Sequence, residues 1–301
     1  MTGEKLVLAT RRSALALAQA RAFMATLLDA RPGLELEELH VTTTGDRVQD
    51  RALSEIGGKG LFIKEIEQAL LDGQARLAVH SFKDVPAELA PGLQIACVPA
   101  REDPRDALVT RTGCGLAELP RGARVGTSSL RRRVQLLRVR PDLEILPLRG
   151  NVDTRLRKCT EGEVDAVVLA CAGLNRLGLA DRITERLEAE VCLPAVGQGA
   201  LAIEIRADDE RTRELLGPLN DVQTAIAAAA ERGVMTAVEG SCQVPLGGYA
   251  VLERGDLWLR AWLSAPDGSN YRRREARWPW TEDLAEAQAR GEELGAALKA
   301  G

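Results

Sequence analysis

The sequence predicts an α/β protein with two domains around a cleft and a smaller α+β domain at its C-terminal end. Segments with strand-like and helix-like patterns alternate over about the first 200 residues, which favours sheets covered by helices on both faces. After Asp221 the pattern changes to a long helix, two segments that alternate like antiparallel strands, and a last amphipathic helix. A length of 301 residues is typical of two or three such domains.

Each expected element has a local signature. The first helix follows a short apolar strand and carries Leu17, Ala20, Met24 and Leu28 at helical spacing. Short apolar runs that end in polar turns predict the strands. The expected strands cover residues 6–9, 34–43, 77–81, 94–99, 108–110, 125, 143–148, 166–170, 249–253 and 257–264. The expected helices cover residues 13–30, 61–71, 128–140, 152–161, 222–238 and 282–298.

Two candidate linkers, at residues 99–104 and 193–199, divide the chain into domains. Two crossings between domains leave a cleft, and ligands of such sheets lie at the carboxyl ends of the strands. We expect domain 1 to hold residues 1–99 with 200–217, domain 2 residues 105–193, and domain 3 residues 222–301. The residues that fall just after predicted strands are Arg11, Asp84, Arg131, Arg149 and Arg176.

Positive charge is concentrated in one stretch of an acidic chain. Residues 121–160 contain eleven Arg or Lys and three Asp or Glu, a balance of +8, whereas the whole chain carries −4 and the remainder therefore −12. Two segments there, 125–133 and 148–155, predict a strand end, a polar turn and a helix start, a geometry that holds anions. Arg131 and Arg132 occupy a first helical turn, where cations oppose the helix dipole, so an anion is expected beside them. Arg133, Arg138 and Arg140 suit a solvated face instead.

Composition excludes several classes of protein. The net charge of −4 and an aromatic content of 3% disfavour nucleic-acid binding. Two histidines, His40 and His80, and the lack of any C-x-x-C pair disfavour a zinc site. No apolar run is long enough to span a membrane, and the twin arginines before residues 14–18 lack the long apolar run of an export signal. Six scattered cysteines indicate reduced thiols and a cytoplasmic protein.

Cys242 is the most unusual thiol of the chain. It lies in a predicted loop after Gly240 and Ser241, with further glycines just beyond, so a ligand could approach it closely. The alternative is another buried thiol, the common state of a free cysteine. A nucleophilic hydrolase is a weak interpretation, because His80 is the only candidate base and nothing completes a triad.

A second candidate site follows the strand at residues 77–81. Lys83 and Asp84 lie in the polar turn beyond it, where an aspartate could stabilise a developing cation or pass a proton. The alternative is a surface ion pair or an ordinary turn before Pro86. The glycine-rich segment 57–60 lacks the spacing of a phosphate loop and is interpreted as a flexible lid, or else as an ordinary loop.

Taken together, these segments resemble the porphobilinogen deaminase (hydroxymethylbilane synthase) family. The matching motifs occur in the order of the family and cover roughly residues 5–250. They are residues 9–13, 44–46, 58–62, 79–86, 103–106, 125–132, 148–155, 172–178, 194–199 and 240–242. The resemblance implies two α/β domains like those of periplasmic binding proteins, with mixed sheets, and a smaller C-terminal α+β domain.

The resemblance also implies the reaction. Members of the family are transferases that join four porphobilinogen molecules head to tail, release ammonia and yield hydroxymethylbilane. The chain grows on a covalent dipyrromethane cofactor, which a thioether would attach to Cys242. Every pyrrole bears an acetate and a propionate, so a polycarboxylate grows in the cleft and requires local positive charge.

Roles for individual residues are carried over from the family motifs. Asp84 would stabilise the positive charge on the pyrrole nitrogens and help to move protons. The residues that resemble the cofactor contacts are Lys83, Thr127, Ser129, Arg131, Arg132 and Arg155. The residues that resemble the substrate contacts, or lie at the cleft and lid, are Arg11, Ser13, Gln19, Lys59, Phe62, Ser81, Arg149, Arg155 and Arg176.

A non-catalytic, two-domain binding protein for an anionic small molecule is the alternative function. It explains the arginines equally well but gives no role to Cys242. We expect porphobilinogen and the growing polypyrrole as the only partners, without nucleic acid or membrane, and no metal. No exposed apolar stripe calls for a dimer, so a monomer is expected.

Overall fold

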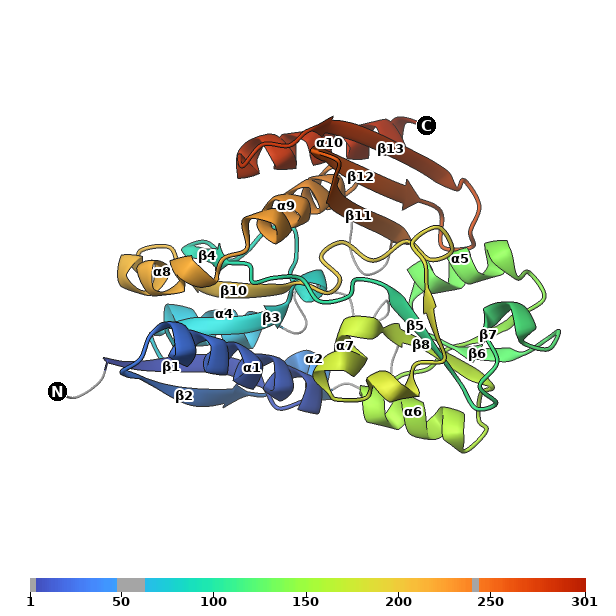
Figure 1. Ribbon diagram of the computed structural model, residues 1–301, viewed down its shortest axis with the longest axis horizontal. Helices are drawn as coiled ribbons and strands as arrows, with labels where there is room; N and C mark the ends of the chain where they lie inside the picture. Colours follow the sequence, from blue (N-terminus) through green and yellow to red (C-terminus); the bar gives the residue numbers. More distant parts are fainter. Residues whose placement is uncertain (1–3, 48–62, 240–243) are drawn as a thin grey trace.

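The computed structural model describes residues 4–47, 63–239 and 244–301 (Figure 1). The first five-stranded sheet has the order β2-β1-β3-β10-β4, in which β1 is parallel to β2 and β3 while β10 is antiparallel to β3 and β4. Its strands are β1 Glu4–Arg11, β2 Leu34–Val41, β3 Leu77–Ser81, β4 Leu93–Cys97 and β10 Leu201–Arg206. Its helices are α1 Ala14–Ala30, α2 Thr44–Arg47, α4 Lys64–Leu71 and α8 Glu210–Leu216, with the 3₁₀ turns η1 Phe82–Asp84 and η4 Gly217–Leu219.

Alternating apolar side chains place helices on both faces of this sheet. Leu6 and Leu8 of β1 pack with Phe23 of α1 and with α8 on one face. Ala9, the next residue along, packs with Ile66 of α4 on the other face. The period of two along the strand therefore produces the layered structure that the sequence predicts.

The second five-stranded sheet has the order β7-β6-β8-β5-β9. Leu136 of α5 lies on one face, and Leu156 of α6 and Leu174 of α7 lie on the other. The strands are β5 Asp106–Thr110, β6 Arg124–Gly126, β7 Glu144–Leu146, β8 Ala166–Ala170 and β9 Glu185–Leu187. The helices are α5 Leu130–Val139, α6 Val152–Thr160 and α7 Cys171–Arg176, with the 3₁₀ turns η2 Leu116–Glu118 and η3 Ala180–Arg182.

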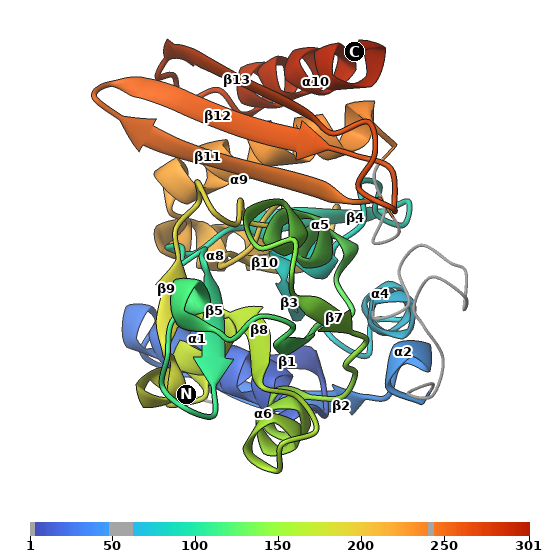
Figure 2. The same ribbon diagram turned by 90° about the vertical axis from the view of Figure 1, so that its right-hand side faces the viewer.

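The C-terminal unit is an antiparallel sheet, β11-β12-β13, packed on two helices. Figure 2 shows this sheet at the top of the molecule together with α10, with α9 between the sheet and β10. The two helices approach closely at Gly291, where a Cβ atom would lie 1.9 Å from the carbonyl oxygen of Ala230, so only glycine fits there. The elements are α9 Val222–Ala237, β11 Leu246–Glu253, β12 Asp256–Leu263, β13 Arg272–Pro279 and α10 Leu284–Ala300.

The predicted fold class is confirmed in its architecture: two α/β units with mixed sheets and a smaller α+β unit. The chain crosses between the two larger sheets twice, after β4 and before β10. The proposed domain boundaries stay a prediction. No helix of the described ranges is both long and apolar enough to cross a bilayer.

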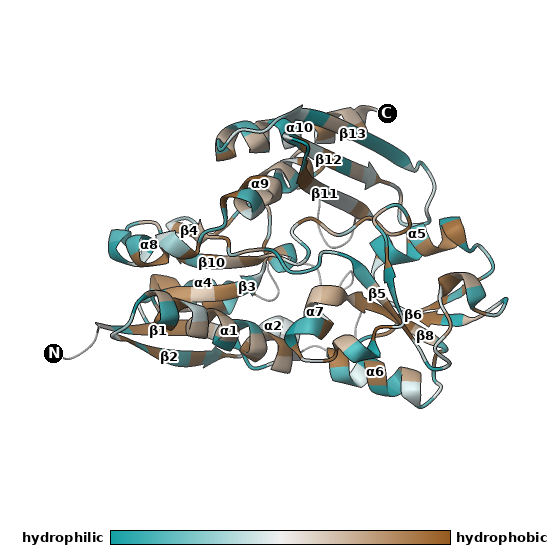
Figure 3. Ribbon diagram, in the orientation of Figure 1, coloured by the Kyte–Doolittle hydropathy of each residue, from teal (hydrophilic) through white to brown (hydrophobic). Residues whose placement is uncertain are grey.

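Besides the 3₁₀ turns, six helices and strands of the described residues were not predicted: α2, α7, α8, β9, β10 and β13. β13 reads Arg-Arg-Arg-Glu-Ala-Arg-Trp-Pro, and Figure 3 shows it as largely hydrophilic. It is nevertheless a strand because all eight of its residues pair with β12. A charged strand at a sheet edge discourages pairing with other chains, and it carries no apolar alternation that a sequence pattern could detect.

Candidate active site

Asp84 lies in the short turn that follows β3, at the carboxyl end of the first sheet. The turn, η1, begins where the buried strand Leu77–Ser81 ends. Asp84 lines a pocket with about 310 Å³ of empty space, together with Arg11 from the end of β1 and Gln19 from α1. Ser81 and His80 of β3 complete the polar part of its wall. The pocket therefore joins a carboxylate to an arginine, an amide and a hydroxyl group.

Two predicted site residues in this pocket hold each other. Gln19 is buried, and its Nε2 donates a hydrogen bond of 2.9 Å to the Ser81 hydroxyl. Ser13 has a structural task as well, since its Oγ accepts a bond of 3.3 Å from the backbone N–H of Ala16 and caps α1. These contacts fix the wall around the Asp84 carboxylate.

His80 is oriented away from any nucleophilic role. Its Nε2 lies 2.8 Å from the buried carboxylate of Glu204 on β10. Burial raises the pKa of the Cys97 thiol to about 12 and, with nearby carboxylates, that of Cys171 to about 12, so these two thiols are poor nucleophiles. Among the described residues, no cysteine lines the pocket of Asp84.

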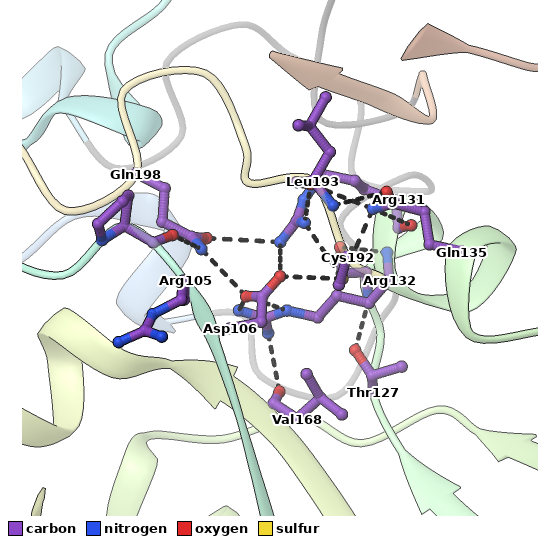
Figure 4. A network of polar contacts seen from close by, with 12 residues as sticks. Arg105, Asp106, Thr127, Arg131, Arg132, Gln135, Val168, Cys192, Leu193 and Gln198 are labelled. Carbon is purple, nitrogen blue, oxygen red and sulfur yellow. Dashed lines mark hydrogen bonds and ion pairs between the residues drawn. The ribbon is translucent and has the colours of Figure 1, made fainter. Parts of the chain in front are cut away.

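Across the cleft, a buried aspartate binds two arginines of α5 (Figure 4). Asp106 is fully buried at the start of β5. Its Oδ2 lies 2.7 Å from Nη2 of Arg131, and its Oδ1 accepts a bond of 2.7 Å from Nη2 of Arg132. Cys192 donates its thiol proton to the same carboxylate over 3.1 Å. Burial alone would raise the pKa of the Asp106 carboxyl, but the two guanidinium groups hold it well below its usual range.

The anion expected beside the first turn of α5 is thus in part internal to the chain. Both arginines are only 6% exposed, so they do not form a solvated face. Further donors of Arg131 bind Leu193 and Gln198, and Nη1 of Arg132 binds the carbonyl oxygen of Val168. Direct contact of these two arginines with a cofactor stays a prediction. Asp106 was not among the predicted site residues, although its segment matched a family motif. The residues next to an aspartate in the sequence do not show which distant cation it binds in the folded protein.

Within the ranges that the structure describes, a second group of cations beside this network lacks carboxylate partners. The Nη1 atom of Arg149 is buried and has no hydrogen-bond partner in the described part of the chain. Arg155 donates from Nε to the carbonyl oxygen of Gly150 over 2.8 Å. Burial, with the charges of Arg132 and Arg149, lowers the pKa of the Arg155 guanidinium to about 10. These side chains are suited to bind acidic groups that the chain itself does not supply.

Lys83 connects the two sides of the cleft. It follows β3 of the first sheet, yet the charges of Arg131 and Arg132, on the second sheet's helix α5, act on it. Burial, followed by the positive charge of Arg132, lowers the pKa of its ammonium group to about 8. The shift therefore reflects mainly the loss of water around the ammonium group and then the nearby guanidinium groups, and a bound polycarboxylate would oppose both.

The turns at the two helix starts follow from their hydroxyl and glycine residues. The hydroxyl of Thr127 accepts a bond of 3.2 Å from the N–H of Ser129, and Ser129 caps α5 by accepting from Arg132. Gly150, with φ of +112°, allows the chain to turn from β7 into α6. Both helix N-termini therefore lie beside the cation cluster and add their own partial positive charge.

Arg176 contacts the linker between the sheets rather than an acid. Its Nη2 donates a bond of 2.7 Å to the carbonyl oxygen of Gly199. Burial lowers the pKa of its guanidinium, against the opposing influence of Glu102. Three predicted site residues, Lys59, Phe62 and Cys242, lie outside the described residues. Cys242 belongs to the connection between α9 and β11.

Comparisons with known proteins decide the family. A family model described as "Porphobilinogen deaminase, dipyromethane cofactor binding domain" matches residues 6–214, and one described as "Porphobilinogen deaminase, C-terminal domain" matches residues 225–300. The chain belongs to the porphobilinogen deaminase family. A porphobilinogen deaminase of Sorangium cellulosum is 64% identical over 99% of both chains, and that of Syntrophobacter fumaroxidans is 53% identical over 89% of this chain and 87% of its own.

Solved structures with a similar fold are more distant. The extracellular-binding protein ytmK of Bacillus subtilis has a TM-score of 0.43 at 7% identity and covers 72% of this chain and 90% of its own. The VFT2 domain of Bordetella pertussis BvgS has a TM-score of 0.42 at 19% identity and covers 70% of this chain and 84% of its own. The predicted resemblance to the porphobilinogen deaminase family is confirmed by the family models and the relatives, which favour the enzyme over the non-catalytic binding protein.

The pKa of Lys83 leads to a test of the cation cluster. In a Cys242→Ala background, which lacks the predicted attachment thiol, Lys83→Met is expected to raise the free energy of unfolding by about 1–2 kcal/mol at pH 7, because an unfavourable charge is removed. Above pH 8 the folded Lys83 binds fewer protons than the unfolded one, so the parent gains stability and the difference disappears near pH 10. Urea unfolding at several pH values measures this difference in the free energy of unfolding between the variant and its parent.

The matched control is Lys299→Met, which removes an exposed lysine paired with Glu239 and is expected to change stability by less than about 0.5 kcal/mol. A Lys83→Met variant less stable than its parent at pH 7 would show that the ammonium group is stabilised where it lies. In that case the cluster does not need an external anion.

Proposed function

We propose that this chain is a transferase that joins four porphobilinogen molecules head to tail with loss of ammonia, and that Asp84 is its catalytic residue. The single observation that carries the proposal is the arrangement of the cleft. Asp84 lines a pocket of the first sheet, and its neighbour Lys83 lies within reach of the charges of the second sheet, where Arg149, whose Nη1 atom is buried, has no carboxylate partner in the described part of the chain. An acidic pyrrole would place its ring by the carboxylate and its acetate and propionate groups by the cations.

The residues present fit a dipyrromethane cofactor. The orphaned Nη1 atom of Arg149 and the lowered pKa values of Lys83 and Arg155 indicate a site built for added negative charge. We assign the carboxylates of the cofactor to a set on the second sheet and the facing turn, with Arg131 and Arg132 set in place by Asp106. That set is Lys83, Thr127, Ser129, Arg131, Arg132, Arg149 and Arg155. When bound, the dipyrromethane supplies a primer with a free α-carbon.

The incoming substrate is assigned to the pocket of Asp84. Arg11 at the end of β1 would bind a substrate carboxylate, and Gln19 with Ser81 would orient the pyrrole. Positive charge develops on the pyrrole nitrogen as ammonia leaves, and again when the coupled α-carbon holds its extra proton. The Asp84 carboxylate would stabilise that charge and help to carry the proton away. Arg176 would contact the substrate at the linker side of the cleft. Lys59 and Phe62, from the segment that precedes α4 in the sequence, would contact it as well.

Intact mass tests the covalent part of the proposal. The purified full-length chain is expected to be heavier than its sequence by one dipyrromethane and to convert porphobilinogen to hydroxymethylbilane. Cys242→Ala is expected to have the mass of its own sequence and to lose turnover. Cys114→Ala, which removes a partly buried thiol of the second sheet, serves as the control and is expected to keep both the added mass and the activity.

Two outcomes would contradict the attachment. One is a parent chain that is active at its unmodified mass, and the other is an added mass that persists in Cys242→Ala. Binding of porphobilinogen without release of ammonia by either protein would favour the non-catalytic binding protein.

We further propose that the chain acts as a cytoplasmic monomer. Among the described residues, the large apolar side chains that are exposed lie on separate helices and form no common patch. They are Leu28, Leu71, Val139, Val222 and Leu284. A single molecular mass near 32.5 kDa in light scattering is the expected result.

A further inference from the structure

The carboxylate of Asp84 is positioned by its backbone and not by its own contacts. It makes no hydrogen bond or ion pair with any residue that the structure describes. A side chain without partners points where its turn directs it, so the residues that hold the turn decide where the charge lies. We therefore asked which groups fix the turn η1 from each side.

The linker between the two large sheets holds η1 on one side. The N–H of Phe82 donates a bond of 3.0 Å to the carbonyl oxygen of Ala200. Gly197, with φ of +69°, lies so close that a Cβ atom there would be 3.1 Å from Cβ of Phe82 and 3.2 Å from the nitrogen of Lys83. The linker therefore packs directly on the peptide that precedes Asp84.

Arg232 of α9 holds the chain on the other side of Asp84. Its Nη2 donates bonds of 2.7 Å and 3.0 Å to the carbonyl oxygens of Pro86 and Ala87, and its Nη1 donates a bond of 3.3 Å to that of Val85. The guanidinium carbon also lies 5.1 Å from the ring centroid of Phe82. One side chain thus contacts the turn both before and after Asp84.

Three consecutive carbonyl oxygens that point at one guanidinium group define the direction of the backbone at 85–87. Arg232 has no carboxylate partner in the described ranges, and burial lowers the pKa of its guanidinium to about 10. Removing a cation even partly from water without an acid beside it costs desolvation free energy, which an apolar side chain of similar length would avoid. The guanidinium group therefore contributes geometry more than stability.

The neighbouring residue on the same helix holds the linker. Glu231 is fully buried, and its carboxylate accepts bonds of 2.6 Å from the N–H of Gly197 and from Nη1 of Arg101. Consecutive residues of α9 thus fix the linker and the loop between which η1 lies. The helix ends at Ala237, shortly before the segment that contains Cys242.

We propose that Arg232 is a positioning residue for Asp84: it holds the backbone of residues 85–87 so that the carboxylate keeps its place at the pocket. The proposal rests on the proposed catalytic role of Asp84. A displacement of about 1 Å is enough to lower a rate by roughly 10²-fold. The loss of Arg232 should therefore reduce turnover although its side chain touches no reacting group.

The test uses the full-length chain with its cofactor attached. Arg232→Met keeps the apolar stem and removes the donors. We expect kcat to fall by roughly 10–100-fold, KM to change by less than about threefold, and the added mass of the dipyrromethane to remain. Arg232→Lys, which keeps one donor group, should recover part of kcat. An unchanged kcat, an effect on KM alone, or loss of the attached cofactor would each overturn the proposal.

Arg140→Met is the matched control for a purely structural loss. Arg140 also donates to backbone carbonyl oxygens, those of Leu116 and Leu119 over 2.7 Å and 2.8 Å, but it does so at the far end of α5. The control variant should lower the melting temperature and leave kcat within about twofold of the parent. If both variants lowered kcat in proportion to lost stability, Arg232 would be a stability residue only.

A double-mutant cycle separates the two levels of the proposal. In an Asp84→Asn background, Arg232→Met should lower the residual rate by less than about threefold, because the charge that it positions is already gone. Full additivity of the two losses would overturn the role of Arg232 and leave that of Asp84 intact. A near-normal rate for Asp84→Asn alone would instead refute the proposed function.

Discussion

Asp84→Asn is expected to keep the fold and the attached dipyrromethane and to lower kcat by roughly 10²–10⁴-fold. Asparagine has the shape of aspartate, so the turn η1 and its contacts with the linker and α9 should survive. Among the described residues, however, the Asp84 side chain is the only carboxylate that lines the pocket. Without it, the positive charge that develops on a pyrrole nitrogen has no counter-charge, and the proton of the coupled carbon has no acceptor there. Product formation and intact mass, measured on the same preparation, check both halves of the expectation.

Glu88→Gln is the control for Asp84→Asn. Glu88 is an exposed carboxylate on the same loop, four residues further on, and it does not line the pocket. Its neutralisation should leave kcat within about twofold of the parent. A similar loss in both variants would mean that the general negative charge of the loop matters. A normal rate for Asp84→Asn would remove Asp84 as the stabilising charge.

Asp106→Asn should be the most destabilising single change in the cleft. It leaves Arg131 and Arg132 buried and without their shared negative charge, and breaking such a buried ion pair from one side costs about 3–5 kcal/mol. The Cys192 thiol also loses its charged acceptor. Urea unfolding at pH 7 measures the difference. Asp142→Asn, which breaks an ion pair with Arg140 nearer the surface, should cost no more than about 1 kcal/mol.

The stability that Asp106 contributes depends on pH in a defined direction. The pKa of its carboxyl is lowered in the folded protein, so its contribution is fully present above the unfolded value of about 4. It is lost as the pH falls from there toward the folded value. The gap between parent and Asp106→Asn should therefore narrow below about pH 4. A gap under 1 kcal/mol at pH 7 would show that the arginines find other partners.

The site lies between two sheets and a third unit. Residues that connect these units therefore also contact and position the side chains of the site. The linkers carry Gly197 and Gly199, which contact the turn of Asp84 and the donor of Arg176. Glu231 and Arg232 then bring the C-terminal unit to the same place. A change in the relative position of the units would therefore change the distance between the Asp84 carboxylate and the cations of the second sheet.

Much of the fold follows from local patterns. The apolar run at 166–170 predicted β8 with its observed bounds, and Ser13 marks the start of α1 because its hydroxyl caps the helix. Strand β10, Leu201–Arg206, was not predicted. It follows the linker directly, and it is a strand because it pairs antiparallel with β3 and β4. Those partners lie about a hundred residues away, beyond the reach of any periodicity.

The candidate site divides in the same way. The order of motifs along the chain identified the family. The turn with Asp84 and the arginine-rich helix starts could also be predicted, because each of them consists of residues that are neighbours in the sequence. The sequence by itself thus predicted most of the chemical groups that we assign to the cleft, but not Asp106. Only the tertiary structure decided which of these charged groups already have a partner of opposite charge. Asp106 binds the two arginines of α5, whereas Arg149 and Lys83 form no ion pair with a described carboxylate. The physical reason is that the strength of a charge interaction depends on how deeply the charges are buried and on the distance between them. Both quantities are set by residues that are far apart in the sequence and come together only in the folded chain.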